Sequence, residues 1–371
     1  MIGLDSSEIP LAGLDITYHA DSAFDHVRQQ LNRLTRLIGL QDVKDQVFRA
    51  YDAICTRSLG FPLGERPPWF SRINADGTPF QYSATLGAPF RSLQFLGEAG
   101  WPNASGTERI RASRECIDYV ARIFNADTEL KAVEDLISAL TPVKDSQLIT
   151  DSAGAFWIGA AFAPNRKPKL RIYLNGNWGR ENDRWAQLRH LASHFGLLNE
   201  WINAEKILKR ETKPLGCAFT ISRGAKVSGR IYVSAYGKLI DYYEELVRAI
   251  SGDQFANVML QHAECLLGTD RIYPTPTAVC SLGLVEGGSL DFKFELCTHC
   301  LFKNDVEASH RLNKCFALAG VNAINYRQLL EILSNGRLDD RSLQLHCYSG
   351  VGIKQGVKYY SVYLKPKLIE V

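Results

Sequence analysis

Five pairs of short strands, each separated from the next by helical segments, restrict the fold of this chain more than any other feature of its sequence. The apolar and polar residues in these segments alternate at a period of two, which is typical of half-buried strands. The alternation predicts strands at 78–86, 90–96, 155–162, 169–175, 217–222, 229–235, 279–285, 290–297, 343–350 and 357–364. Because pairs of helical segments lie between the strand pairs, the sequence predicts one ααββ unit that is used five times.

Each predicted strand has one apolar face and one polar face. In the segment 169–174, the odd positions carry Lys, Arg and Tyr, and the even positions carry Leu, Ile and Leu. The same split recurs in the segment 343–348, where Gln344, His346 and Tyr348 form the polar face. Successive side chains on a strand point to opposite sides of the sheet, so we expect the helices to cover the apolar face.

Closing ten strands into a barrel removes the exposed edges of an open sheet and directs the polar face into a lumen. A barrel of ~8 strands is filled by its own side chains, so ten strands should leave room for a ligand. We therefore predict an α/β fold, namely a ten-stranded antiparallel β-barrel surrounded by α-helices. The pattern predicts a single domain over residues 1–371 that begins with an N-terminal arm at 1–20.

Charge and composition argue against several classes of protein. The chain has 43 basic and 40 acidic residues and a net charge of +3, which disfavours a nucleic-acid footprint or a polybasic membrane patch. Its apolar runs are shorter than the ~18–20 residues of a membrane span, and its first ten residues lack the basic-then-apolar order of a signal peptide. We expect a cytoplasmic protein whose nine scattered cysteines are reduced thiols, mostly in the core.

Cationic side chains from three strand pairs are predicted to face the lumen. Arg171, Arg230 and Lys293 each come from a different pair, and Tyr173 and Tyr232 follow the two arginines at a distance of two residues. Several cations that converge with hydroxyl donors suit an anion of several charges, such as a diphosphate. The alternative is that these side chains are solvated charges on exposed strands.

Tyrosines near the C-terminus extend this pattern. Tyr359 and Tyr363 share one face of the last predicted strand. Tyrosine rings can shield a carbocation through their π faces, and their hydroxyl groups can bond to phosphate. The alternative is that these rings only pack against their neighbours, as aromatic residues on strands commonly do.

Several short segments resemble the aromatic prenyltransferases of the dimethylallyltryptophan synthase type, and in particular the bacterial indole prenyltransferases. Residues 76–83, Asp-Gly-Thr-Pro-Phe-Gln-Tyr-Ser, resemble the family segment Gly-Thr-Pro-x-Glu-x-Ser, and Arg91 falls where a diphosphate-binding arginine follows it. The two Arg-x-Tyr pairs resemble the family's Lys-x-Tyr pairs, and Tyr359-x-x-x-Tyr363 resembles its closing tyrosine pair. The order of these segments agrees with the family along essentially the whole chain.

The resemblance implies transfer of a prenyl group from dimethylallyl or geranyl diphosphate to an indole or tryptophan-derived acceptor in specialised metabolism. It implies that the prenyl diphosphate is a co-substrate and that the enzyme requires no cofactor and no magnesium. Carried over by position, the diphosphate ligands are Arg91, Arg171, Arg230 and Lys293, and the tyrosine shield is Tyr173, Tyr232, Tyr359 and Tyr363. The cations would stabilise the departing diphosphate, and the closed lumen would exclude water.

Gln81 departs from the family, which usually has a glutamate there that binds the indole N–H group and helps to remove a proton. An amide can orient that donor but is a poor base. Either another group, such as His346 or Glu295, then takes the proton, or the acceptor is not a simple tryptophan. The alternatives are prenylation of a phenol, a guanidine or a peptide side chain, and a barrel that binds a phosphorylated ligand without turning it over.

Two segments have spacings found in zinc sites, although we predict no metal. His190 and His194 lie one helical turn apart but lack the intervening glutamate of a metalloprotease. Cys297 and Cys300 form a Cys-x-x-Cys motif, but no second such motif follows. We also expect the strand there to send the two cysteines to opposite faces. Further candidate ligands beyond the motif are His310 and Cys315.

Overall fold

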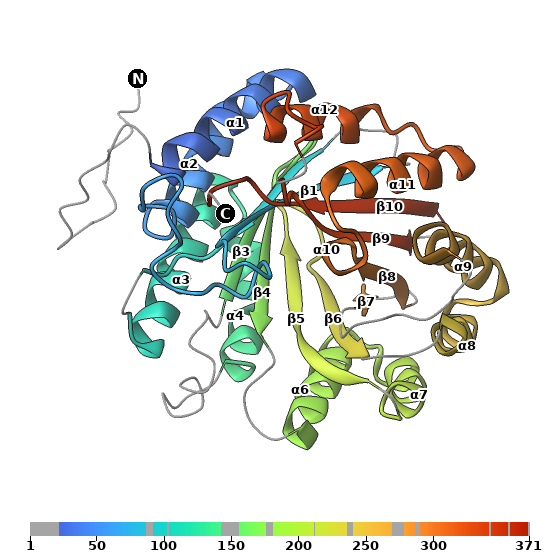
Figure 1. Cartoon of the computed structure of the whole chain (residues 1–371). Helices are drawn as coiled ribbons and strands as arrows, with labels where there is room; N and C mark the ends of the chain where they lie inside the picture. Colours follow the sequence, from blue (N-terminus) through green and yellow to red (C-terminus); the bar gives the residue numbers. More distant parts are fainter. Residues whose placement is uncertain are drawn as a thin grey trace.

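Ten strands form one closed barrel in the computed structural model (Figure 1), which confirms the predicted fold. The structure describes residues 22–86, 92–101, 104–141, 156–175, 181–210, 212–235, 240–268, 278–285, 290–340, 343–354 and 357–369, hereafter the described residues. The strands are β1 (Phe80–Leu86), β2 (Leu93–Gly97), β3 (Phe156–Phe162), β4 (Lys169–Asn175), β5 (Lys213–Ile221), β6 (Ser228–Ala235), β7 (Ala278–Leu284), β8 (Asp291–Cys297), β9 (His346–Lys354) and β10 (Val357–Leu364).

Each strand pairs in antiparallel fashion with its neighbours in the sequence, and β1 closes the barrel by pairing with β10. The predicted strands have the observed bounds at β4 and β10, and they differ by one residue at one end of β3, β6 and β8. β5 begins four residues before the predicted segment 217–222 because its register shifts between Pro214 and Gly216. Such a shift interrupts the alternation of faces, so the sequence pattern did not extend across it.

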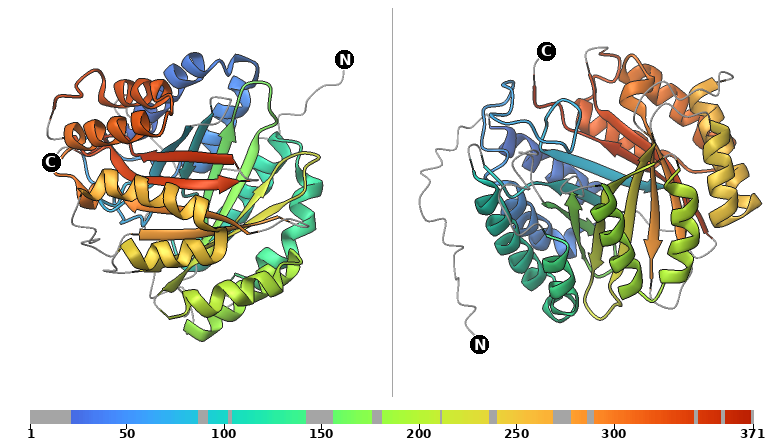
Figure 2. Two further views of the ribbon diagram at one scale, coloured as in Figure 1. Left: turned by 90° about the vertical axis from the view of Figure 1, so that its right-hand side faces the viewer. Right: turned by 90° about the horizontal axis from the view of Figure 1, so that it is seen from below.

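In the described part of the chain, two helices precede each strand pair, as the predicted repeat requires, and the short helices η1 and α10 are additional. Figure 2 shows them outside the strands when the molecule is turned to the side and seen from below. Their bounds are α1 (Ala23–Ile38), η1 (Gln41–Val43), α2 (Lys44–Cys55), α3 (Gly106–Ile123), α4 (Asp127–Ala139), α6 (Glu181–His194), α7 (Leu198–Leu208), α8 (Ile240–Ser251), α9 (Asp253–Leu267), α10 (Thr298–Leu301), α11 (Asp305–Leu318) and α12 (Ile324–Ser334).

Helix α1 shows how local sequence sets these boundaries. The Ser22 side chain caps the first turn by accepting a hydrogen bond of 3.1 Å from the backbone N–H of Asp25. Gly39 ends the helix in the left-handed conformation with φ of 80°, which favours glycine. Between these residues, Val27 and Leu31 are fully buried on the face that packs against the barrel.

The hydrophobic core is the layer between the barrel and the helices. Phe80, Phe95 and Phe162 come from three neighbouring strands, and their rings stack in sequence with centroid distances of 5.8 and 6.2 Å. Each fully buried side chain of this size contributes ~1.5–3 kcal/mol relative to an exposed one. The apolar faces of the strands therefore point outward, which leaves the polar faces for the lumen.

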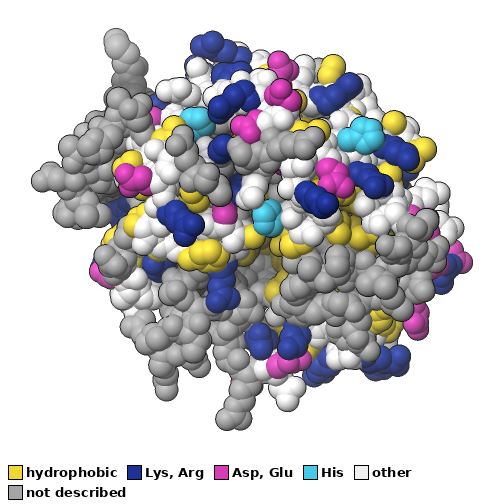
Figure 3. Space-filling model, viewed as in Figure 1, with side chains coloured by type: hydrophobic (Ala, Val, Ile, Leu, Met, Phe, Trp, Pro, Cys, Tyr) yellow, Lys and Arg dark blue, Asp and Glu magenta, His cyan; other side chains and the backbone are white. Residues whose placement is uncertain are grey.

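The outer surface agrees with the small net charge. On the face shown in Figure 3, basic and acidic side chains are interspersed. Among the described residues, no helix is long and apolar enough to cross a membrane.

Candidate active site in the barrel lumen

Strand pairing directs the three predicted cations toward the lumen. Residues that pair across neighbouring strands share a face, and Arg230 pairs with Ala218 on β5, two residues before Thr220, the partner of Arg171. Continuing around the barrel, Tyr232 pairs with Ser281, which pairs in turn with Lys293. Arg171, Arg230 and Lys293 therefore project from β4, β6 and β8 to the same side, opposite to the apolar face.

Arg171 and Arg230 are half-buried, and both lie close to Tyr232 and Tyr363. The rings of Tyr173 and Tyr232 are 6.1 Å apart, and Nη1 of Arg230 donates a hydrogen bond of 2.9 Å to Ser281. Burial opposes the charge of Arg230, but the acidic groups around it outweigh this effect and raise its pKa. Burial also opposes the charge of Arg171, but the nearby tyrosines outweigh this effect and raise its pKa. Both guanidinium groups are therefore cationic at any physiological pH.

Arg171 also has an unused donor. Its Nε is buried and makes no hydrogen bond within the described part of the chain. An unpaired charged donor inside a protein is costly unless a ligand or water satisfies it. The free N–H therefore suits an anionic ligand in the lumen.

Lys293 already has partners inside the barrel. Its Nζ lies 2.5 Å from Oε1 of Glu295 and donates to the hydroxyl group of Tyr363. The same Nζ lies 4.6 Å from the centre of the Tyr363 ring and 6.0 Å from that of Tyr359. Burial raises the pKa of the Tyr363 hydroxyl well above its usual value, so this group stays neutral and can donate a hydrogen bond.

Two glycines on β9 leave the space that these side chains fill. A Cβ atom at Gly352 would lie 2.5 Å from Cζ of Tyr359, and a Cβ atom at Gly350 would lie 2.8 Å from Cγ of Glu295. Neither distance is possible without displacing the lumen side chain. Glycine at these two positions on the inner face of β9 therefore leaves room for Tyr359 and Glu295 in the lumen.

Gln81 lies near one end of the lumen in a network of buried polar groups. Its Nε2 donates a hydrogen bond of 3.0 Å to Oδ1 of Asn74, and the same Oδ1 accepts from Sγ of Cys347 at 3.1 Å. Asn74 is held in turn because its Nδ2 donates to the backbone carbonyls of Thr78 and Phe80. The position of Gln81 is therefore fixed by the segment that precedes β1.

Glu98 is a buried carboxylate that we did not predict. It follows β2 with the parity of the inward-facing Gln94 and Leu96, and this parity is the signal that could have identified it. Its Oε1 accepts a hydrogen bond of 2.8 Å from Ser71, whereas its Oε2 has no partner among the described residues. Burial raises the pKa of Glu98, although Ser71 and Arg109 oppose this rise.

His346 does not join the lumen residues. Its Nδ1 lies 2.5 Å from Oδ1 of Asp305 and its Nε2 lies 2.6 Å from the hydroxyl group of Tyr326, so it packs against α11 and α12 outside the barrel. The expected alternation fails here because the pairing of β9 with β10 shifts between Tyr363 and Leu364. The extra residue of this bulge, Cys347, reverses which face His346 occupies.

The other predicted site residues differ in where they lie relative to the lumen. The structure brings Arg171, Arg230, Lys293, Glu295 and the four tyrosines of the predicted shield to the inner side of the barrel. Gln81 lies at the end of the same lumen. Arg91 lies outside the described residues.

The candidate zinc ligands are not gathered into one site. His190 and His194 are exposed on α6, and Cys315 contacts Nδ1 of His262 at 3.1 Å. Sγ of Cys297 and Sγ of Cys300 are 2.9 Å apart. Among the described residues, no group of three or more His, Cys, Asp or Glu side chains could hold a metal ion.

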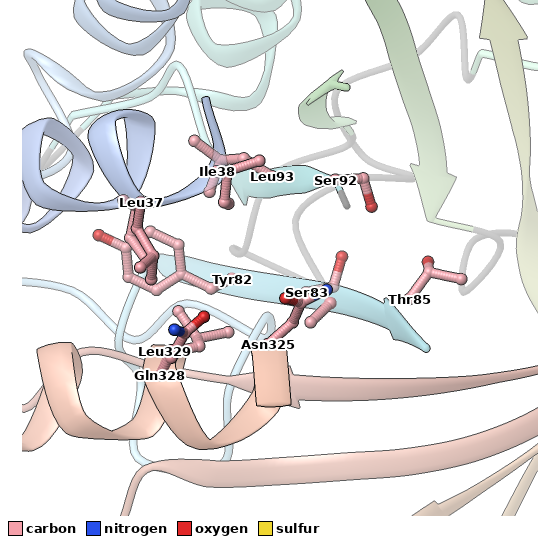
Figure 4. A pocket seen from close by; sticks show the side chains of 12 residues that line it. Leu37, Ile38, Tyr82, Ser83, Thr85, Ser92, Leu93, Asn325, Gln328 and Leu329 are labelled. Carbon is pink, nitrogen blue, oxygen red and sulfur yellow. The ribbon is translucent and has the colours of Figure 1, made fainter. Parts of the chain in front are cut away.

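A separate pocket lies between α1, α12 and the first two strands. Figure 4 shows Leu37 and Ile38 on one side of it and Gln328 and Leu329 on another. Its lining residues include neither a charged side chain nor any of the predicted site residues. This pocket is therefore poorly suited to a diphosphate.

No family model matches the sequence, and no curated protein matches it. The fold is similar to solved dimethylallyltryptophan synthases. The 5-dimethylallyltryptophan synthase from Streptomyces coelicolor has 20% identity and a TM-score of 0.80, covering 95% of this chain and 100% of its own. The 6-dimethylallyltryptophan synthase from Micromonospora olivasterospora, solved with DMASPP and Trp, has 19% identity and a TM-score of 0.78, covering 94% and 99%.

A more distant similarity extends to AnaPT from Neosartorya fischeri, with 13% identity, a TM-score of 0.72, and coverage of 94% of this chain and 95% of that chain. At these identities the comparison establishes the fold. The expected resemblance to the prenyltransferase barrel is therefore confirmed at the level of architecture.

Proposed function

We propose that this protein is an aromatic prenyltransferase that transfers a dimethylallyl or geranyl group from its diphosphate to an indole or tryptophan-derived acceptor. The observation that carries the proposal is the convergence of Arg171, Arg230 and Lys293 on the inner side of a closed barrel, among tyrosines. The similar synthases from Micromonospora olivasterospora and PriB, which were solved with tryptophan and dimethylallyl thiolodiphosphate analogues, support the choice of substrates.

The cations bind the diphosphate and stabilise it as it leaves. Arg171 has a free Nε donor, and Arg230 is oriented by Ser281. Charge-assisted hydrogen bonds to phosphate oxygens strengthen as negative charge develops on the leaving group. Because these side chains supply positive charge themselves, we propose that the reaction requires no magnesium ion, with Arg91 as a further diphosphate ligand.

The tyrosines protect the allylic cation. Tyr173, Tyr232, Tyr359 and Tyr363 present ring faces and hydroxyl groups to the same space as the cations. A ring face stabilises positive charge, and a lumen walled by these rings restricts water that would convert the cation to an alcohol.

We assign to Glu295 the role of accepting the proton that the aromatic acceptor loses. When the allylic carbon bonds to the aromatic ring and its bond to diphosphate breaks, the ring must lose the proton of the substituted carbon to recover aromaticity. Glu295 is a carboxylate on the same face as the diphosphate ligands, whereas Gln81 is an amide and His346 bonds to Asp305 outside the barrel. Gln81 then orients the acceptor.

A second candidate is prenylation of a different nucleophile, such as a phenol, a guanidine or a peptide side chain. It is favoured by Gln81, which cannot act as the carboxylate that the family uses at this position. In both candidate reactions the lumen cations would bind the diphosphate and stabilise it as it leaves.

Mass spectrometry of EDTA-treated protein tests the proposal. The protein is incubated with dimethylallyl or geranyl diphosphate and with tryptophan, indole dipeptides, tyrosine or arginine derivatives. We expect the mass of one prenyl unit to be added to an indole acceptor. Product on tyrosine or arginine alone would support the second candidate, and diphosphate binding without any product would support a non-catalytic barrel. Product only after magnesium is restored would contradict metal independence.

A further inference from the structure

Cys297 and Cys300 lie at the junction between β8 and the single turn α10. Their Sγ atoms are 2.9 Å apart. The expectation that the two side chains point to opposite faces is wrong, because the strand ends at Cys297 and the chain turns into α10 before it reaches Cys300. A helical turn places residues three apart on the same side.

The geometry requires little change to form a covalent bond. A disulfide has an S–S distance of ~2.05 Å, so the sulfur atoms need to approach by less than ~1 Å. The two thiols differ in exposure, since Cys297 is buried and Cys300 is half-buried. Burial raises the pKa of the Cys297 thiol, and the adjacent Cys300 adds to this effect. Cys300 is therefore the thiol that a reagent in solution reaches first.

We propose that Cys297 and Cys300 are a redox modification site, which forms an intramolecular disulfide by exchange with a small-molecule disulfide such as oxidised glutathione. The thiolate of Cys300 attacks one sulfur of glutathione disulfide and releases one glutathione. The sulfur of Cys297 then displaces the second glutathione from Cys300. Two thiol protons are lost, the two cysteines are oxidised, and one glutathione disulfide is reduced to two glutathione thiols.

The modification site is linked to the lumen by direct contacts. Cys297 pairs with Tyr348 across β8 and β9, and the ring of Tyr348 meets that of Tyr363 edge to face at 6.4 Å. Tyr363 in turn accepts a hydrogen bond from Lys293. A displacement of ~1 Å in a supporting residue can reduce turnover by as much as about 10²-fold, and smaller displacements reduce it less. We expect the disulfide to lower prenyl transfer and its reduction to restore prenyl transfer. This expectation rests on the proposed function.

Peptide mass spectrometry tests disulfide formation without any assay of activity. The full chain is incubated with oxidised glutathione, the remaining thiols are alkylated, and the protein is digested with trypsin. Cleavage after Lys293 and Lys303 places both cysteines in one peptide, Phe-Glu-Leu-Cys-Thr-His-Cys-Leu-Phe-Lys. We expect this peptide to lose two hydrogen atoms and to escape alkylation. A doubly alkylated peptide, or a link from Cys297 to the neighbouring Cys347, would overturn the assignment.

Two variants separate this site from other thiols. Cys300→Ser should abolish the bond, whereas Cys265→Ser, which alters another half-buried cysteine, should leave it unchanged. Prenyl transfer by wild type and Cys265→Ser should fall about tenfold on oxidation and recover with dithiothreitol, while Cys300→Ser should not respond. A disulfide that forms without changing turnover would overturn the link to the lumen but not the site. If reduced wild type forms no product, the proposed function fails, and the mass measurement still decides whether the disulfide forms.

Discussion

Nζ of Lys293 lies 2.5 Å from Oε1 of Glu295, two residues further along β8, and both side chains face the lumen. Residues two apart on a strand point to the same side, so the strand itself creates this ion pair. The pair holds a cation and a carboxylate in the space where we propose that diphosphate leaves and a ring proton is lost. A bound diphosphate would compete with Glu295 for Lys293, which would free the carboxylate for the proton.

The change Glu295→Gln tests this division of roles. The amide keeps the size of the side chain but cannot accept the proton, so we expect kcat to fall by about 10²–10⁴-fold. The KM for prenyl diphosphate should stay level or decrease, because Lys293 loses a competing anion. Steady-state kinetics checks both values, with Glu331→Gln on the exposed face of α12 as the matched control. A kcat equal to that of wild type would exclude Glu295 as the proton acceptor.

Arg230→Ala and Arg171→Ala should each weaken binding of the prenyl diphosphate. A hydrogen bond to a charged group contributes about 1.5–3 kcal/mol, so the Kd should rise roughly 10-fold to 150-fold. Isothermal titration with dimethylallyl thiolodiphosphate measures this change directly. The exposed Arg223→Ala provides a control with the same loss of charge. Equal affinities for Arg223→Ala and the two lumen variants would mean that the diphosphate binds elsewhere.

Gly352→Ala should damage the tyrosine shield without unfolding the barrel. The added Cβ would lie 2.5 Å from Cζ of Tyr359, so that ring must move away from Lys293. We expect the variant to convert more of the prenyl diphosphate to prenyl alcohol, because water reaches the allylic cation. Chromatography of the alcohol and the prenylated acceptor gives the ratio, and circular dichroism checks the fold. Tyr359→Leu should raise the ratio in the same direction, and an unchanged ratio in both variants would remove Tyr359 from the shield.

The alternation of polar and apolar residues predicted most of the lumen-facing residues, because this alternation depends only on the local geometry of a strand. Arg171, Arg230, Lys293 and the tyrosines that share their face follow from strand parity and from closure of the barrel. The parity failed at His346 because the bulge at Cys347, on the same strand, depends on the pairing of β9 with β10 and leaves no mark in the local alternation. Glu98 was missed for a related reason, since it follows the end of β2 and its partner Ser71 comes from the segment before β1.

The pH dependence of stability should reveal a buried neutral histidine. His262 is 1% exposed, its Nδ1 contacts Cys315, and burial lowers its pKa from 6.5 to about 4. Between these two values the unfolded chain binds a proton that the folded chain does not, so the free energy of unfolding decreases as the pH falls. The free energy of unfolding is lowered by about 3 kcal/mol once the pH is below the pKa of the folded state. Above the pKa of the unfolded state it is not lowered.

Urea unfolding of wild type and His262→Gln across this pH range isolates the contribution, because the other titrating groups cancel in the difference. We expect the stability of wild type relative to the variant to decrease as the pH falls below about 6.5, since only wild type must exclude a proton from the core. His190→Gln on the exposed face of α6 is the matched control for the substitution itself. Parallel curves for His262→Gln and wild type would mean that His262 takes up its proton in the folded state as readily as in the unfolded chain.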